Sequence, residues 1–231
     1  MRLSVVVPAL NEEVALPETL RRVALACPSA EIIVVDGGST DRTASIAQTS
    51  GAWVMASPKG RGRQQNAGAQ ASVGDVLLFL HADTLLPEGA ERAIKIAIAD
   101  KRVVGGNFRL RFAPPGPTNY LFGLFYHVRS RYFRHYFGDS CFWIRKSIFE
   151  EMGGFRQGML MEDLEFIHRF EARCKAQGER SVLLPLTVDT SDRRVSGRRR
   201  WRTVYLWVYL HLLHARGVSG DKLAEMYPEV R

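Results

Sequence analysis

The sequence predicts an α/β protein with a Rossmann-like, mostly parallel sheet flanked by helices. Two observations support this class. Short runs rich in Val, Ile and Leu alternate with segments of helical character in the first hundred residues, at 3–7, 32–35, 52–56 and 76–80. The runs are apolar without interruption, as expected for strands that are buried on both faces of a parallel sheet. Right-handed β-α-β connections join strands of this kind.

Helical periodicity is clearest after the first strand. Apolar residues recur there at the spacing of one helix face, at Leu16, Leu20, Val23 and Cys27. We expect this helix to begin at Glu12, with Asn11 as its N-cap. A second helix is expected at 41–49, because Ser39 or Thr40 can cap it.

The pattern changes after about residue 100. Residues 106–112 alternate apolar and polar side chains, which predicts a half-exposed strand in a mixed sheet. A proline-rich turn at 114–117 leads into an aromatic segment of helical character at 120–137. Its rings suit either packing of a helix on the sheet or stacking on a sugar. The remaining elements are expected as a strand at 141–144, a helix at 161–176 and a strand at 183–188.

The length of the chain, 231 residues, suits one large α/β domain and is short for two. We expect a nucleotide-binding half at 1–100 and an acceptor-binding half at 101–190. Residues 191–231 are expected to form a basic loop and a C-terminal helix. The two main halves would then belong to a single domain.

Composition bears on location. No run of 18 apolar residues occurs and the N-terminus does not resemble a signal peptide, so no transmembrane segment is expected. The three cysteines lack a CxxC pair and suit buried thiols in a reducing compartment. We therefore expect a cytoplasmic protein. Its apolar tail at 201–213 would pack on the domain, with an anionic membrane surface or a homodimer contact as the alternatives.

The chain is basic, with a net charge of +8. Such a balance suits an anionic partner, which includes nucleic acid, acidic lipid and phosphorylated small molecules. The excess is concentrated at 193–202, where six of ten residues are arginine. Charge alone does not choose among these partners.

Three loops with acidic residues follow the predicted strands. They lie at 8–12, 36–41 and 81–83. Ligands of open parallel sheets bind beyond the carboxyl ends of the strands, where these loops meet. Asp36 and Asp41 taken alone would suit turns and helix caps. Three such loops at one edge favour a ligand site.

The same loops resemble a known family. Residues 5–13 (VVVPALNEE) and 34–41 (VVDGGSTD) are similar to the opening motifs of family 2 glycosyltransferases, which are inverting enzymes with the GT-A fold. Further similarities follow in order at 60–68, 74–83, 153–155 and 162–163. Each motif is weak alone, but the ordered set covers about residues 3 to 170. The chain resembles in particular a bacterial subgroup of short, soluble members with His-Ala-Asp in place of Asp-x-Asp.

The resemblance implies a nucleotide-sugar donor, with UDP favoured. Asp36 would accept a hydrogen bond from the uracil imide, beside Gly38, and charge-assisted bonds of this kind are strong. Arg61 and Gln65 of a glycine-rich loop would approach the nucleotide, as would Ala82. A solvated basic loop is the alternative for the arginine. The base and ribose would contact Pro8, Ala9, Leu10, Asn11 and Glu12.

The resemblance also implies a divalent metal, Mn²⁺ or Mg²⁺. His81 and Asp83 stand where the family carries Asp-x-Asp, and alternate residues of an extended chain face the same way. Asp83 would bind the ion that bridges the donor phosphates, and Mn²⁺ also tolerates imidazole. Histidine in place of aspartate removes a negative charge from this site. The alternative is that His81 only bonds a neighbouring backbone group.

Catalysis is assigned by the resemblance to Asp163, with Glu162 beside it. Inversion requires one in-line displacement, so one general base that deprotonates the acceptor hydroxyl is sufficient. By position alone, two acids in the first turn of a helix would only stabilise its dipole. Asp139, next to Gly138, is expected to bind the acceptor, whose identity stays open.

Arg193 and Arg194 are expected to close over the donor diphosphate, because guanidinium groups match phosphate oxygens. Processive members of the family carry Gln-x-x-Arg-Trp near this place. Gly197 stands at the position of that glutamine, before Arg200 and Trp201. The sequence thus argues against a polymerising synthase.

Two other functions fit part of the pattern. A nucleotidyltransferase of related fold would open with a glycine-rich loop after the first strand, and residues 8–12 are not of that kind. A nucleic-acid-binding protein would suit the basic charge. Its arginines would be expected along a helix with exposed aromatic side chains, whereas these cluster in one late segment. We therefore expect no nucleic-acid partner.

Overall fold

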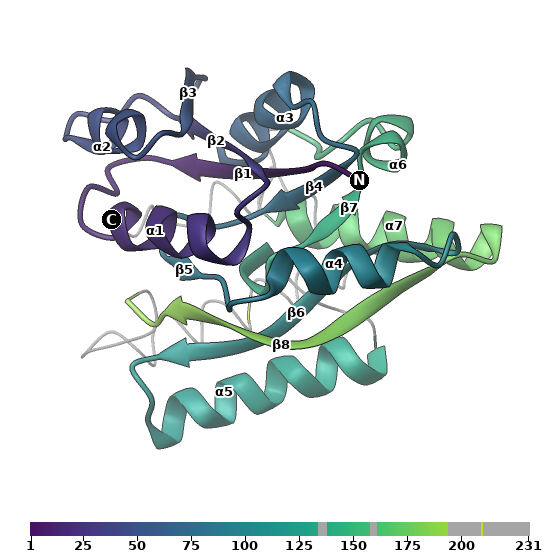
Figure 1. Ribbon diagram of the computed structural model, residues 1–231. Coiled ribbons are helices and arrows are strands. Elements are labelled where there is room, and N and C mark those ends of the chain that lie inside the picture. Colours follow the sequence, from purple (N-terminus) through teal and green to yellow (C-terminus); the bar gives the residue numbers. More distant parts are fainter. Residues whose placement is uncertain (134–137, 158–160, 194–208, 210–231) are drawn as a thin grey trace.

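The computed structural model describes residues 1–133, 138–157 and 161–193, together with Tyr209. In these residues eight strands form one sheet with the order β3-β2-β1-β4-β7-β6-β8-β5, and helices cover it on both faces (Figure 1). Four strand pairings are parallel and three are antiparallel. The predicted α/β class is confirmed. No helix in the described part is long and apolar enough to span a bilayer.

The first half of the chain builds the parallel part of the sheet. Its strands are β1 (Leu3–Ala9), β2 (Glu31–Asp36), β3 (Trp53–Ala56) and β4 (Val76–Phe79). The side chains of β1 and β4 are almost all buried, which explains their unbroken apolar sequence. All four strands lie where the apolar runs predicted them. Their carboxyl ends meet at one edge of the sheet.

The second half adds the mixed part. Its strands are β5 (Thr84–Leu85), β6 (Val103–Ala113), β7 (Trp143–Arg145) and β8 (Arg180–Ser191). β7 runs antiparallel to β4 and β6 and so joins the two halves, while β8 pairs with both β6 and β5. The alternation predicted for 106–112 is confirmed, since Arg109 and Arg111 are exposed between buried apolar neighbours.

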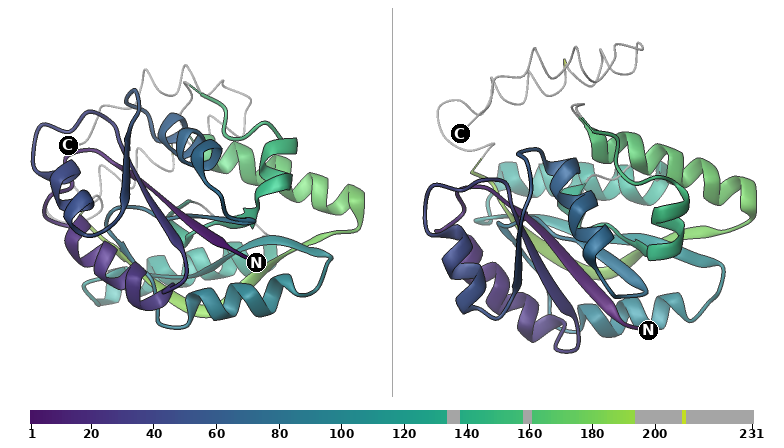
Figure 2. Two further views of the ribbon diagram at one scale, coloured as in Figure 1. Left: turned by 45° about the horizontal axis from the view of Figure 1, so that its top comes forward. Right: turned by 90° about the horizontal axis from the view of Figure 1, so that it is seen from above.

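Helices cover each face of the sheet. One face carries α1 (Leu16–Ala26), α2 (Thr43–Thr49) and α4 (Ala90–Ile98), and the other carries α3 (Arg61–Ala71), α6 (Lys146–Glu151) and α7 (Glu162–Gln177) (Figure 2). The core on the α7 side is rich in aromatic rings, from Phe79, Phe142, Phe149, Phe155, Phe166 and Phe170. Contact between α3 and the sheet depends on Gly68, where an added Cβ would lie 2.4 Å from Cγ1 of Val6.

Helix α5 (Pro117–Val128) lies at the end of the sheet that β6 and β8 form (Figure 1). A π-helical turn (Arg129–Phe133) continues it. The aromatic segment expected at 120–137 is therefore helical as far as it is described, and 134–137 lie outside the described residues. The tail at 201–213 also lies outside them, apart from Tyr209.

The expected starts of two helices are wrong. Helix α1 begins at Leu16, and Asn11 does not cap it. Asn11 has a positive φ of 54° and accepts a hydrogen bond from the backbone N–H of Thr40 instead. The apolar face predicted for this helix is buried. Helix α2 begins at Thr43, whose N–H is satisfied by Asp41 at 2.9 Å and not by the expected cap.

The glycine-rich loop expected after β3 is also wrong. Residues from Arg61 form helix α3, and Gly60 sets the turn before it with a φ of 138°. The sequence does not indicate this helix because its buried side is largely polar, with Gln64 and Gln65 almost fully buried. A search for apolar periodicity does not detect such a helix.

Candidate active site

The loops after β1 and β2 are joined to each other by hydrogen bonds. The backbone N–H of Asn11 donates to the Ser39 hydroxyl at 2.9 Å, and that of Glu12 donates to the Thr43 hydroxyl at 2.7 Å. These bonds hold the two loops as one wall at the edge of the sheet. Of the residues expected to line a base and ribose, Ala9 is almost fully buried, while Pro8, Leu10, Asn11 and Glu12 keep exposed surface.

Asp36 ends β2 and organises the turn that follows it. One carboxylate oxygen accepts the N–H groups of Gly38 at 3.1 Å and Ser39 at 3.0 Å, and the other accepts the Ser39 hydroxyl. Gly38 takes a positive φ of 91°, which this turn requires. The carboxylate is half-buried and fixed. Its contact with a nucleobase stays a prediction.

Helix α3 supplies a residue that the sequence reasoning missed. The amide of Gln64 donates to the carbonyl oxygens of Ala9 at 2.9 Å and Val35 at 2.7 Å, and so ties the ends of β1 and β2 together. Its neighbour Gln65, which was expected to approach the nucleotide, is buried in the same helix. A polar pair inside a glycine-rich motif was the signal available in the sequence.

Asp83 lies beside Arg193. Strand β5 begins directly after Asp83 and pairs with β8, and the hydroxyls of Thr84 and Thr190 meet at 2.9 Å. This pairing places Arg193, just past β8, with its Nε 2.9 Å from Oδ2 of Asp83. Arg193 also binds the carboxylate of Glu12. One guanidinium thus joins the loops after β1, β4 and β8.

The charge of Arg193 is favoured by these contacts. The hydrogen bond to Glu12 raises its pKa above the ordinary value, burial acts against this, and the charge of Asp83 raises it further. The two carboxylates form a site with affinity for a cation. Ala82, the middle residue of His81-Ala82-Asp83, is buried, and its carbonyl accepts the hydroxyl of Thr19 at 2.8 Å. Arg194 lies outside the described residues.

His81 faces the acceptor half. Its Nδ1 lies 3.2 Å from Oδ1 of Asp139 in the 3₁₀ turn Gly138–Ser140, which the sequence reasoning did not anticipate. His81 and Asp83 were expected to face the same ligand, as alternate residues of an extended chain do. Ala82 and Asp83 instead form a turn, so this expectation does not apply here. Within the described ranges no three His, Cys, Asp or Glu side chains group as ready metal ligands.

The acidic pair at the start of α7 is bound to α3. Nε of Arg61 lies 2.7 Å from Oε1 of Glu162, and its Nη2 lies 3.4 Å from Oδ1 of Asp163. Burial acts to lower the pKa of Arg61, but the charges of Glu162 and Asp163 outweigh it and raise that pKa. Arg61 was expected at the nucleotide. The structure places it against the candidate base.

Two more contacts join motifs that are distant in sequence. The amide of Asn66 donates to the carbonyl of Phe155 at 2.7 Å and accepts its N–H at 2.9 Å. Helix α3 is thereby fixed to the turn that precedes α7. In the acceptor half, the amide of Asn107 donates to the hydroxyls of Ser130 at 3.1 Å and Ser140 at 3.2 Å. These residues line a small pocket beside the loop of Asp139.

The sequence profile described as "Glycosyl transferase family 2" matches residues 4–153. The chain belongs to this family. Its fold is the GT-A fold of this family. The match includes the loops of Glu12, Asp36 and Asp83 and ends before the acidic pair of α7.

Curated relatives of this chain are named undecaprenyl-phosphate 4-deoxy-4-formamido-L-arabinose transferase. The protein from Pseudomonas paraeruginosa is 40% identical over 115 residues, which is 44% of this chain and 34% of the relative. That from Sodalis glossinidius is 33% identical over 117 residues, 45% of this chain and 36% of the relative. The matched region is about a third of the length of these relatives.

Solved structures support the GT-A fold. The S. aureus TarS fragment 1–349 in complex with UDP-GlcNAc has a TM-score of 0.65 and 18% identity, over 87% of this chain and 61% of that one. The mannosyltransferase PcManGT from Pyrobaculum calidifontis, in complex with GDP-Man and Mn²⁺, has a TM-score of 0.63 and 18% identity, over 91% and 61%.

Proposed function

We propose that this glycosyltransferase moves a sugar from a UDP-sugar to an acceptor with inversion, assisted by a divalent cation. The observation that carries the proposal is the separation of two charged clusters. Glu12, Asp83 and Arg193 lie at the nucleotide loops, while Arg61 joins the acids at the start of α7. We assign the first cluster to the donor diphosphate and the second to the acceptor.

The donor side suits a nucleoside diphosphate. The joined loops after β1 and β2 form a fixed wall, and Asp36 is an acceptor for an imide N–H. Two named neighbours were solved with nucleotide sugars, UDP-GlcNAc and GDP-Man. We take the base to be uracil, as the resemblance of the opening motifs to the family implies, with Asp36 as the acceptor of its imide N–H.

The residues also fit a divalent cation. The carboxylates of Glu12 and Asp83 both contact the guanidinium of Arg193. A divalent ion bound by these carboxylates could take the place of that guanidinium. Asp83 would hold Mn²⁺ or Mg²⁺, and His81 would contribute only after release from Asp139. Such an ion neutralises charge on the leaving diphosphate. Arg193, displaced from Asp83, would then be available to a phosphate oxygen.

On the acceptor side, Asp163 would take the proton of the attacking hydroxyl. The adjacent Arg61 favours the ionised form of a carboxylate, which is the form that a base requires. Glu162 holds Arg61 in place, and Asp139, whose charge also acts on Arg61, would bind the acceptor together with His81. The proposal assigns one base, Asp163, and a single displacement with inversion requires no more than one.

Two acceptor classes are separated by this mechanism. A hydroxyl must lose its proton during attack, whereas a phosphate monoester is already ionised near neutral pH. The curated relatives are named for transfer that involves undecaprenyl phosphate. We propose a cytoplasmic enzyme with peripheral membrane contact. Its acceptor class can be determined at Asp163, because a hydroxyl acceptor requires this base and a lipid phosphate does not.

The donor assignment is tested by thermal denaturation of the full chain. UDP at about 100 times its dissociation constant should add about 2.7 kcal/mol, and more with Mn²⁺ or Mg²⁺ present. Asp83→Asn should remove the metal dependence more than the binding of UDP itself. If no nucleoside diphosphate shifts the Tm at saturating metal, the donor assignment is wrong.

A further inference from the structure

The outer side of α5 and the turn after it is apolar and exposed. Tyr120 is 71% exposed and Tyr132 is 75% exposed. Between them the large exposed side chains follow helical spacing. We call this surface the α5 stripe, and it consists of Tyr120, Leu121, Leu124, Phe125, Val128 and Tyr132.

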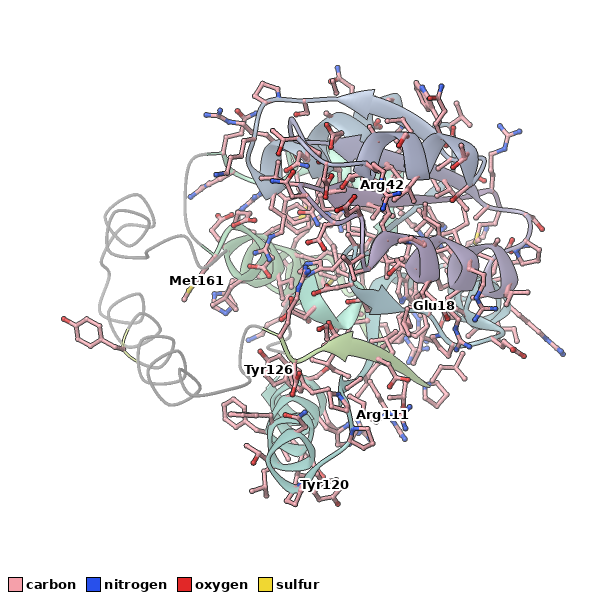
Figure 3. All side chains as sticks on the ribbon, turned by 90° about the vertical axis from the view of Figure 1, so that its left-hand side faces the viewer. Glu18, Arg42, Arg111, Tyr120, Tyr126 and Met161 are labelled. Carbon is pink, nitrogen blue, oxygen red and sulfur yellow. The ribbon has the colours of Figure 1, made fainter. Side chains whose placement is uncertain are left out.

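The inner side of α5 fixes the direction in which this stripe faces. The ring of Phe112 in β6 meets those of Phe122 at 6.2 Å and Tyr126 at 5.4 Å. Asn119 donates to Asp192 at 2.8 Å and anchors the start of the helix to the chain beyond β8. In Figure 3, Tyr126 lies on the side of α5 toward the strands and Tyr120 lies at the outer edge of the molecule. The stripe therefore points away from the sheet.

The segment that carries the stripe has basic charge only, and the aspartates nearest to it, Asp189 and Asp192, are bonded to Arg111 and Asn119. From residue 103 to 138 the sequence has no Asp or Glu and has five arginines. Arg131 is exposed beside Tyr132, at the end of the stripe. Exposed rings and aliphatic side chains bordered by arginine are typical of a helix that lies in the interface of an anionic bilayer. Tyrosine is suited to that position because its ring is apolar and its hydroxyl is polar.

We infer that the α5 stripe is the surface by which this enzyme binds an anionic lipid bilayer. The inference rests on the peripheral membrane contact proposed above and deepens it by naming the surface. It assigns the contact to α5, whereas the sequence analysis gave membrane contact only as an alternative for the tail at 201–213. The transfer reaction itself is not required for the binding.

The position of the stripe connects the membrane to the acceptor side. Asn107 bonds Ser130, in the turn that continues α5, and Ser140, next to Asp139. When the stripe lies on a bilayer, the loop that carries Asp139 is held close to the lipid surface. An acceptor borne by a lipid would then reach the site from the membrane.

The test is flotation of the full chain with vesicles. Wild type should bind vesicles of phosphatidylglycerol and phosphatidylcholine and should be released by raised salt, since arginine contributes to the contact. The double variant Leu121→Glu with Phe125→Glu should lose about tenfold or more in vesicle affinity, because two apolar contacts are replaced by like charges facing the lipid. Leu25→Glu with Ile96→Glu, on exposed positions of α1 and α4, is the matched control and should bind as wild type does.

The outcomes separate the stripe from the membrane contact and from the transfer reaction. If wild type does not bind these vesicles, the membrane contact and the inference are both wrong. If the double variant binds as tightly as wild type, another surface makes the contact and the α5 assignment is overturned. If the stripe is instead a contact with a second copy, the double variant should change its oligomeric mass, and wild type should not bind vesicles. If the stripe is instead packed inside the fold, the double variant should show a large fall in Tm, again without vesicle binding by wild type. Either result overturns the inference. UDP binding should stay unchanged in the double variant.

Discussion

Nε of Arg193 lies 2.9 Å from Oδ2 of Asp83, and the same guanidinium binds Glu12. The arginine therefore occupies the side of the site where the donor diphosphate and its cation are proposed to bind. Its single positive charge offsets one of the two negative charges of these carboxylates. A metal ion bound to Asp83 would displace the guanidinium of Arg193, which could then bind the phosphates.

Arg193→Ala should weaken UDP binding by about tenfold, which corresponds to the loss of one charged hydrogen bond. Binding of uridine should be nearly unchanged, because the nucleoside has no phosphate for the guanidinium. Calorimetric titration with UDP and with uridine measures both. Arg42→Ala is the matched control, since Arg42 is paired with Glu13 near the same edge and is far more exposed. Equal losses for UDP and uridine would show that Arg193 has a structural role only. Arg194→Ala is expected to act as Arg193→Ala does, although Arg194 lies outside the described residues.

Arg61→Gln should destabilise the protein by about 3 kcal/mol at neutral pH, because Glu162 and Asp163 would stay buried without their counter-charge. Urea denaturation at neutral pH measures this. Arg63→Gln changes an exposed residue of the same helix and should stay within about 0.5 kcal/mol of wild type. A stable Arg61→Gln protein that no longer binds UDP would instead support the nucleotide contact expected from the sequence.

Asp163→Asn should retain the fold and the affinity for UDP but lower turnover by about 10²–10⁴-fold if the acceptor is a hydroxyl. Asparagine keeps the shape of the side chain and removes its basicity, so the effect isolates proton transfer. Slow hydrolysis of the donor by water serves as the assay before an acceptor is known. Glu162→Gln is the comparison and should reduce turnover less.

Near-normal turnover of Asp163→Asn with a lipid phosphate would mean that an acceptor already ionised is used. Near-normal turnover with a hydroxyl acceptor or with water would contradict the assignment of the base. The product should have the anomeric configuration opposite to that of the donor. Retention would exclude a single displacement.

Cys27 should make stability depend on alkaline pH. Burial raises the pKa of its thiol to about 12, and the charge of Glu91 acts in the same direction. Between the pKa of an unfolded cysteine, about 8.5, and this higher value, the native state keeps the proton while the unfolded state releases it. The free energy of unfolding should therefore fall as the pH rises, by about 1.4 kcal/mol per pH unit from this residue. In urea titrations from pH 8 to pH 10, Cys27→Ala should have the shallower slope, and parallel slopes would contradict the prediction.

Some features of this protein follow from the sequence alone. The four parallel strands and the apolar face of α1 are predicted because burial on both sides, or on one side, leaves a local pattern of apolar residues. The ordered motifs indicate the family, which the match over residues 4–153 shows. Helix α3 was missed because its buried side chains are amides, which bond the backbone of β1 and β2 rather than forming an apolar stripe.

The partners of the charged residues at the site were decided by the tertiary structure. Arg61 and Glu162 are distant in sequence and meet only because α3 and α7 pack on the same face of the sheet. Arg193 reaches Asp83 only because β8 pairs with β5. Residue type and local spacing determine which groups can ionise and which strands are buried. The pairing of these charges depends on strand order and helix packing. Both bring together residues that are far apart in the sequence, and no local pattern of residues indicates that they will meet.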